Sequence, residues 1–285
     1  MHFFEALTPI NGTLGEKYLR EFRGIKGELP ADFKYNPSMY HFEVKDNLPG
    51  IMIPVKDVNG KLIGLNRIFL NKDGSKLKIN SKIASKNGDS VKASAKLGKG
   101  IAKNGTIDIN HGCIPGTTFV SEGTENALTA KEVMPLFDIK SCISVSGLKG
   151  IQFTPGTHTV IIIADNDGRH DGTKEQLINA VQQFLERGLQ VNIVMPETTS
   201  LNEKLDLNDV YKVNGADAVK KILDDRIRIR NYRDLGAKDE PLPVSLNRIR
   251  EQELNRAVSI DQNRQITEPT PTVKQMQKES GGLER

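Results

Sequence analysis

Apolar residues in the first third of the chain follow a helical spacing and then form two short runs. Leu14, Tyr18 and Phe22 recur every four residues, which predicts a helix. Farther on, two apolar runs flank Asn59 and Gly60. This dipeptide between two such runs is the strongest short signal for a β-hairpin. We therefore expect a helix followed by a small antiparallel sheet, which is an α+β arrangement.

From residue 117 onward, apolar runs of strand length alternate with segments of helical spacing. The predicted strands are 117–123, 142–147, 159–164 and 190–196. Strands that alternate with helices build a parallel sheet through right-handed crossovers. This part of the chain is therefore expected to be an α/β domain, with a central parallel sheet flanked by helices.

The same patterns divide the chain into three expected parts. These are an N-terminal α+β domain over 1–112, the α/β domain over 113–230 and a polar C-terminal extension over 231–285. Within the extension, residues 245–258 have the spacing of an amphipathic helix. The last residues are polar, with Pro and Gly, and are predicted to be disordered or a linker.

Composition narrows the class of protein only modestly. A net charge of +4 over 285 residues does not by itself indicate a nucleic-acid partner, and 5% aromatic residues without Trp argue against a broad stacking platform. Only Cys113 and Cys142 are present, so no zinc ribbon or disulfide framework can form, and a reducing cytoplasm is the expected compartment. No apolar run has the length of a membrane span, so no membrane partner is expected.

Two carboxylates follow the most apolar strand of the α/β part. Four apolar residues, Val160 to Ile163, lead through one alanine to Asp165 and Asp167. In an extended chain, residues two apart point to the same side, and ligands of α/β proteins bind at the carboxyl ends of the strands. Two such oxygen ligands suit Mg²⁺ or Mn²⁺. A plain Asx-rich turn explains the same residues equally well.

Further acids follow other predicted strands. Glu122, with Gly123 after it, ends the first strand of the α/β part. Asp206 and Asp209 lie in the polar segment after the fourth strand. Acids at the carboxyl ends of separate parallel strands are expected to meet at one edge of the sheet.

Residues 76–103 form a basic stretch, with eight lysines and one acid, a local balance of +7. Gly and Ser between the lysines predict strand and loop rather than a long helix. Such a stretch is typical of a surface that binds phosphates, and Lys78, Lys82 and Lys86 are the candidate nucleic-acid or nucleotide ligands. A solvated surface loop is the alternative.

These motifs, in this order, resemble the Toprim domain, and more closely the primase-like Toprim proteins of phages, plasmids and other mobile elements. The segments that carry the resemblance are TFVSEGTENALTA (118–130), SVSGLKG (144–150), IIIADNDG (161–168) and LDLNDV (205–210). Residues 15–25 and 49–70 are similar to the N-terminal module of that group. Related segments also occur in large conjugative-transfer relaxases.

The resemblance implies a set of roles. Glu122 would be a general acid/base or help to hold metal, and Asp165 and Asp167 would bind Mg²⁺ or Mn²⁺. Asp206 and Asp209 would be accessory acids. The turn glycines that match the motifs are Gly123, Gly147 and Gly168.

The implied activity is primase-type nucleotidyl transfer in DNA replication or conjugation. Single-stranded DNA and nucleotides would be the partners, together with a larger conjugation or replication protein. Two alternatives stay open, a non-catalytic DNA-binding module of a relaxase and a Toprim nuclease. No P-loop is present, and the five histidines are scattered, so neither a fused helicase nor a relaxase metal site is expected.

Overall fold

The structure is a computed structural model, and it describes residues 2–78, 81–84, 90–93, 95–100, 105–168 and 173–267. Lys86 lies outside the described residues, and so do residues 268–285 of the end predicted to be disordered (266–285), whose first two residues are the last of a helix. For Lys82, only the backbone, within a strand, is described.

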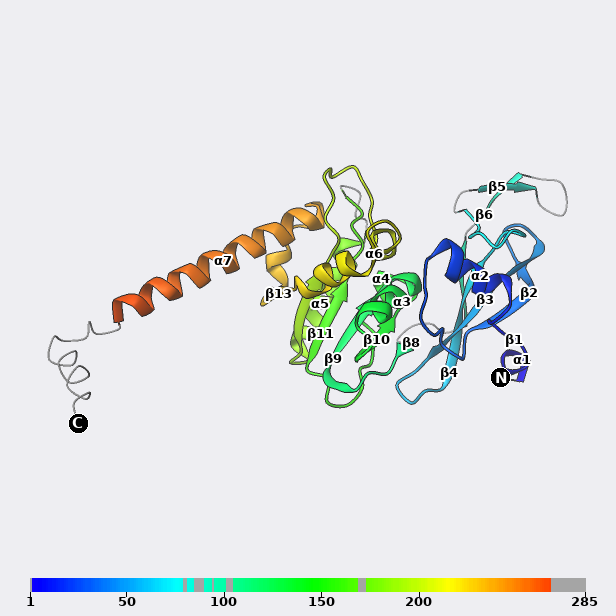
Figure 1. The fold of residues 1–285 in the computed structure, drawn as a ribbon, viewed down its shortest axis with the longest axis horizontal. Coiled ribbons are helices and arrows are strands. Elements are labelled where there is room, and N and C mark those ends of the chain that lie inside the picture. Colours follow the sequence, from blue (N-terminus) through cyan, green and yellow to red (C-terminus); the bar gives the residue numbers. More distant parts are fainter. Residues whose placement is uncertain are drawn as a thin grey trace, which may run out of the picture.

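A five-stranded antiparallel sheet forms the N-terminal part, as predicted (Figure 1). Its strands, in spatial order, are β1 (Thr8–Pro9), β2 (Lys34–His41), β3 (Asp46–Lys56), β4 (Leu62–Phe69) and β7 (Lys96–Gly100). The predicted hairpin joins β3 to β4, and Gly60 takes the left-handed backbone that such a turn requires, with φ +76°. The strands β5 (Ser81–Ala84) and β6 (Ser90–Ala93) pair separately.

The predicted N-terminal helix is present but is short and irregular. It starts as α2 (Leu14–Lys17) and continues as a π-helical turn, Tyr18–Phe22. Gly24 ends it in a left-handed conformation, with φ +72°. A further short helix, α1 (His2–Glu5), precedes β1.

A six-stranded sheet forms the second part of the molecule, and its four middle strands are parallel, as predicted. In spatial order they are β13 (Ile227–Ile229), β12 (Gln190–Val194), β11 (Thr159–Ile163), β9 (Ile114–Ser121), β10 (Phe137–Ser141) and β8 (Ile107–Asn110). The edge strands β13 and β8 run antiparallel to their neighbours. The predicted central strand, β11, lies between two parallel partners, and Val160 to Ile163 are at most 2% exposed.

The strand predicted over 142–147 is wrong. The second parallel strand is β10, which ends at Ser141, and the segment after it contains the short helix α4 (Val145–Leu148). Val145 and Leu148, three residues apart, both face the core in this helix. The polar character of β10 hid it, because its Lys140 is buried in an ion pair with Asp108 of β8, with 2.6 Å between Nζ and Oδ1.

Helices cover both faces of the second sheet. The helices α3 (Thr124–Val133) and α6 (Leu207–Asp224) belong to a core that also contains residues of β3 and β4. The other face packs α4, α5 (Lys174–Glu186), the 3₁₀ turn Tyr232–Leu235 and the start of α7 (Leu242–Thr267). The core that contains α3 and α6 therefore joins the two sheets.

The division into three domains stays a prediction, and the structure refines where its boundaries fall. The strand β8 pairs with β10, so the second sheet begins before residue 113. The predicted helix of the C-terminal extension is present, and its first turns are buried in the core of the second sheet. The rest of α7 projects away from the body of the molecule (Figure 1). No helix in the described part of the chain is long and apolar enough to span a bilayer.

Candidate active site

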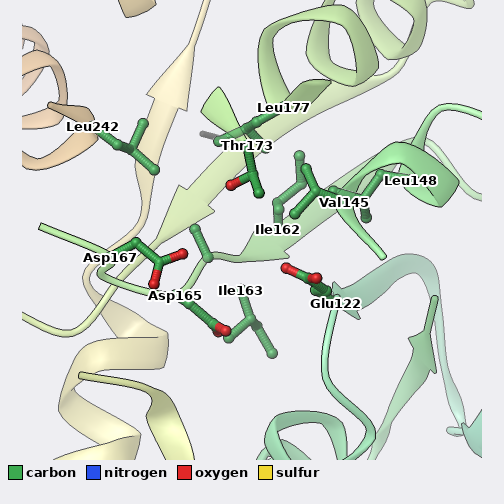
Figure 2. A pocket seen from close by; sticks show the side chains of 11 residues that line it. Glu122, Val145, Leu148, Ile162, Ile163, Asp165, Asp167, Thr173, Leu177 and Leu242 are labelled. Atoms are coloured by element: carbon green, nitrogen blue, oxygen red, sulfur yellow. The ribbon is translucent and has the colours of Figure 1, made fainter. Parts of the chain in front are cut away.

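Two neighbouring parallel strands deliver three carboxylates to one pocket. Glu122 follows β9 directly, and Asp165 and Asp167 follow β11 after one alanine. Figure 2 shows these side chains around a single pocket, as expected from the i, i+2 spacing and from their positions at the carboxyl ends of parallel strands. The pocket wall is otherwise mostly apolar and includes Val145, Leu148, Ile162, Leu177 and Leu242.

Asn166 fixes the turn that carries the two aspartates. Its side chain is buried and donates a 2.9 Å hydrogen bond to the carbonyl of Pro196. Its backbone pairs with Leu205, and its Oδ1 accepts a 3.1 Å bond from the backbone N–H of Gly168. Gly168 has φ +66°, and a Cβ there would lie 2.3 Å from the carbonyl oxygen of Leu201. The turn therefore requires glycine at this position.

The other two predicted turn glycines do not have that role. Gly123 is the N-cap residue of α3 with φ −90°, and the nearest atom to an added Cβ would be 3.7 Å away. Gly147 lies inside the helix α4. At these two positions, the backbone conformation does not demand glycine.

Burial and neighbouring acids act together on Asp165. Burial is the main cause that raises the pKa of this carboxyl group to about 7, and the charges of Asp206, Glu122 and Asp167 add to the effect. Asn126 donates a 2.7 Å hydrogen bond from Nδ2 to Oδ1 of Asp165. The site thus concentrates more negative charge than its surroundings neutralise.

The predicted accessory acids, Asp206 and Asp209, both lie at the start of α6. Asp206 is the N-cap of α6, and its side chain accepts a 2.7 Å hydrogen bond from the backbone N–H of Asp209. Burial raises the pKa of Asp206, whose charge also acts on Asp165. Asp209 lies in the first turn of α6. Asp167 contacts Lys204 on the surface, with 2.9 Å between Oδ1 and Nζ.

The acids fit a hard divalent cation by charge and ligand type. Burial first, and the neighbouring carboxylates second, disfavour the charged form of Asp165, so a cation that enters this group of acids would stabilise that charge. Among the residues that the structure describes, no three His, Cys, Asp or Glu side chains are placed to hold one ion. Joint ligation by Glu122, Asp165 and Asp167 therefore requires their side chains to move.

A buried ion network beside the acids escaped the sequence interpretation. Glu125, in the first turn of α3, is 4% exposed and accepts hydrogen bonds from the Tyr18 hydroxyl at 2.9 Å and from Lys76 and Lys96 at 2.8 Å each. Burial alone would raise the pKa of Glu125, but Lys96, Lys76 and Arg23 hold it well below its usual range. These partners all come from the N-terminal part, so the network joins it to the second sheet.

A second chain of hydrogen bonds runs from the N-terminal part to Asp165. Asn208 accepts from Arg23 Nη1 at 3.3 Å and donates through Nδ2 to the Arg23 carbonyl at 2.8 Å. The backbone N–H of Asn208 donates to Oδ1 of Asn126 at 2.9 Å, and Asn126 holds Asp165. The available signal was a pair of polar residues, Glu125 and Asn126, directly before the short apolar pair Ala127 and Leu128.

The lysines of the basic stretch that contact the network beside the candidate site are not the three that were predicted to bind nucleic acid. Lys76 and Lys96 contact Glu125, whereas Lys78 is exposed. The nucleic-acid role of Lys78, Lys82 and Lys86 stays a prediction.

Comparison with known families supports the Toprim resemblance. Residues 117–217 match a Toprim domain family, and residues 1–93 match a domain of unknown function (DUF7146). No curated protein matches the chain.

Solved primase structures share the fold. The zinc-binding and RNA polymerase domains of the Aquifex aeolicus primase superpose with a TM-score of 0.52 and 13% identity, over 80% of this chain and 60% of that one. The DnaG primase catalytic domain bound to ssDNA superposes with a TM-score of 0.50 and 12% identity, over 81% of each chain. The chain thus spans about 60% of the length of the Aquifex structure. The chain therefore contains a Toprim domain over residues 117–217 and has the fold of the primase catalytic core.

Proposed function

We propose that the protein is a Mg²⁺-dependent, primase-type nucleotidyltransferase that acts on single-stranded DNA. The observation that supports this most is the gathering of Glu122, Asp165 and Asp167 at one pocket on the carboxyl edge of the Toprim sheet. Phosphoryl transfer by such a site depends on positioning and on stabilising charge, and acids that hold a divalent cation supply both.

In this proposal Asp165 and Asp167 hold the metal, and Glu122 accepts the proton of the attacking hydroxyl group. That hydroxyl attacks the α-phosphate of a nucleoside triphosphate, a phosphodiester forms and pyrophosphate leaves. When bound, the metal neutralises charge on the transferred phosphate. Asn126 keeps Asp165 oriented through its 2.7 Å hydrogen bond.

The partners in this proposal are single-stranded DNA and nucleotides. The neighbouring structure with bound ssDNA belongs to a protein of the same fold, which supports the choice of DNA. Lys78, Lys82 and Lys86 contribute point charges toward phosphates. A mobile-element setting and a larger replication or conjugation protein, which supplies template recognition, complete the proposal.

A synthesis assay tests it. The protein is incubated with single-stranded DNA, labelled nucleotides and Mg²⁺ or Mn²⁺, and products are resolved by length. The proposal expects labelled products that appear only with both metal and template. Shorter DNA fragments would instead identify a nuclease, and no change in length at any metal concentration would leave a binding module.

A further inference from the structure

Two exposed aromatic rings lie beside a hollow in the N-terminal part. Tyr40 and Phe42, at the turn from β2 to β3, are 58% and 57% exposed. They line a hollow of about 430 Å³, whose other lining residues are Asn36, Ser38, Met39, Met52 and Arg67. Among the residues that the structure describes, no acid lines this hollow.

The hollow lies on the face of the N-terminal sheet that is turned away from the candidate active site. Side chains alternate between the two faces of a strand. Ile51 of β3 and Ile68 of β4 belong to the core shared with the second sheet. Met52 and Phe69, next to them in sequence, belong to a separate small cluster on the opposite face. A ligand in the hollow would therefore not compete for the catalytic acids.

Arg67 gives the hollow a positive charge. Its guanidinium lies 5.4 Å from the centre of the Phe69 ring and donates to the carbonyl oxygens of Tyr40 at 3.3 Å and Leu97 at 3.4 Å. The ion pairs found within the described residues do not include one with Arg67. Met52 pairs across the sheet with Arg67 on one side and with Lys34 on the other. Lys34 therefore faces the same side of the sheet as Met52 and Arg67, outside the lining of the hollow.

We propose that this hollow binds about one or two unpaired bases of single-stranded DNA, with Tyr40 and Phe42 as stacking surfaces and Arg67 as the contact for the backbone phosphate. Exposed rings beside arginine suit any base, because every base presents a π-face. A protein partner would also suit Tyr, Met and Arg, but a cation without acids favours a polyanion. The choice of DNA as ligand rests on the proposed function.

Fluorescence anisotropy with the full chain, without metal or nucleotides, tests this. The probes are a labelled oligothymidylate and an oligonucleotide of equal length and charge with abasic sites. The wild-type protein should bind the base-containing probe more tightly. Tyr40→Ala with Phe42→Ala should weaken that binding about five- to hundredfold, the range for loss of base stacking, with an unchanged salt slope. The abasic probe should bind both proteins alike.

Matched variants make the result decisive. Tyr40→Phe with Phe42→Tyr keeps both rings and should bind as the wild type does. Val58→Ala, which truncates another exposed side chain (59% exposed) in the turn between β3 and β4, should do the same. Arg67→Met should weaken both probes and flatten the salt slope by about 0.7. The inference would be overturned if the wild type bound the two probes with equal affinity, or if Tyr40→Ala with Phe42→Ala kept full affinity. The hollow would then suit a protein ligand better than DNA. Either result would leave the proposed function standing, because the synthesis assay tests the acids and not this hollow.

Discussion

At the scale of single residues, the proposed catalytic role of Glu122 is open to a direct test by one substitution. It is half-buried at the end of β9 and lines the pocket with Asp165 and Asp167. Glu122→Gln keeps its shape and removes the ionisable group. We expect normal folding and DNA binding with activity reduced at least about a hundredfold, the usual contribution of a general acid or base.

The control for this prediction is Glu175→Gln, which makes the same chemical change on the exposed first turn of α5. It should leave turnover unchanged. Near-normal turnover in Glu122→Gln would make Glu122 a structural residue and weaken the primase proposal.

Asp165 predicts a pH dependence of stability. Its pKa in the folded protein is about 7, against an ordinary value of 3.8. The folded state therefore holds more protons than the unfolded state between about pH 4 and pH 7, so this residue lowers the free energy of unfolding as pH rises through that window. Without metal, Asp165→Asn should raise Tm at pH 8 by several degrees and have little effect near pH 4.

Thermal melts of both proteins across pH 4–8, in the presence of a chelator, measure this. A difference in Tm that is the same at every pH would show that the pKa of Asp165 is not raised in the folded protein.

At the scale of elements, the start of α7 is locked to the start of α5 by one buried ammonium group. Lys174 is fully buried and donates to the carbonyls of Ala237 at 2.9 Å and Glu240 at 2.6 Å, and to the Ser245 hydroxyl at 2.8 Å. Leu242, in the same segment, forms part of the pocket wall. The C-terminal segment therefore shapes the candidate site.

Replacing Lys174 with Met should release this lock. Three buried acceptors would lose their donor, so we expect a loss of about 3 kcal/mol in the free energy of unfolding. Hydrogen exchange should accelerate in residues 237–249 before it does in the N-terminal sheet. Lys220→Met, on an exposed helix face, is the control and should change stability by less than about 0.5 kcal/mol. Unchanged exchange in residues 237–249 would contradict the lock.

The same element scale shows what sequence reasoning could reach. The apolar run before Asp165 predicted a central parallel strand, because four consecutive β-branched residues are typical of a strand that is buried on both faces of an α/β sheet. It also predicted that Asp165 lies at the carboxyl edge of this sheet. The prediction of a strand over 142–147 was wrong. The true strand, β10, alternates polar with apolar residues, and its Asp138 and Lys140 do not look like residues of a buried strand. The helix α4 has only four residues, which is too short a segment for a helical spacing to be recognised in the sequence.

At the scale of the whole molecule, the network around Glu125 links the two sheets. Its contacts are separated by up to 107 residues in sequence, between Tyr18 and Glu125. Such a network forms only when distant parts of the chain come together in the fold. Local residue spacing therefore did not indicate it. The lysines were visible as a basic stretch, but their acidic partner was not.

Glu125→Gln tests the link. It leaves Lys76 and Lys96 without their carboxylate, and the loss of one partner from a buried ion pair costs about 3–5 kcal/mol. Because the pKa of Glu125 lies well below 4.5, this loss should be complete above about pH 5 and shrink in acid. Urea denaturation at pH 7 and pH 3 measures it, with the exposed Glu186→Gln as control. A loss below about 1 kcal/mol at pH 7 would show that the network does not hold the two parts together.

The most direct test of the central claim, that the acids at the sheet edge form a metal centre, is the melting temperature with and without Mg²⁺ or Mn²⁺. Binding to the folded state at a hundredfold excess over Kd adds about 2.7 kcal/mol, or roughly 5–10 °C for a chain of this size. Asp165→Asn with Asp167→Asn should abolish the rise. Asp217→Asn with Asp239→Asn, the same charge change at exposed sites, should retain it. A rise that persists in the first variant, or none in the wild type, would contradict the account.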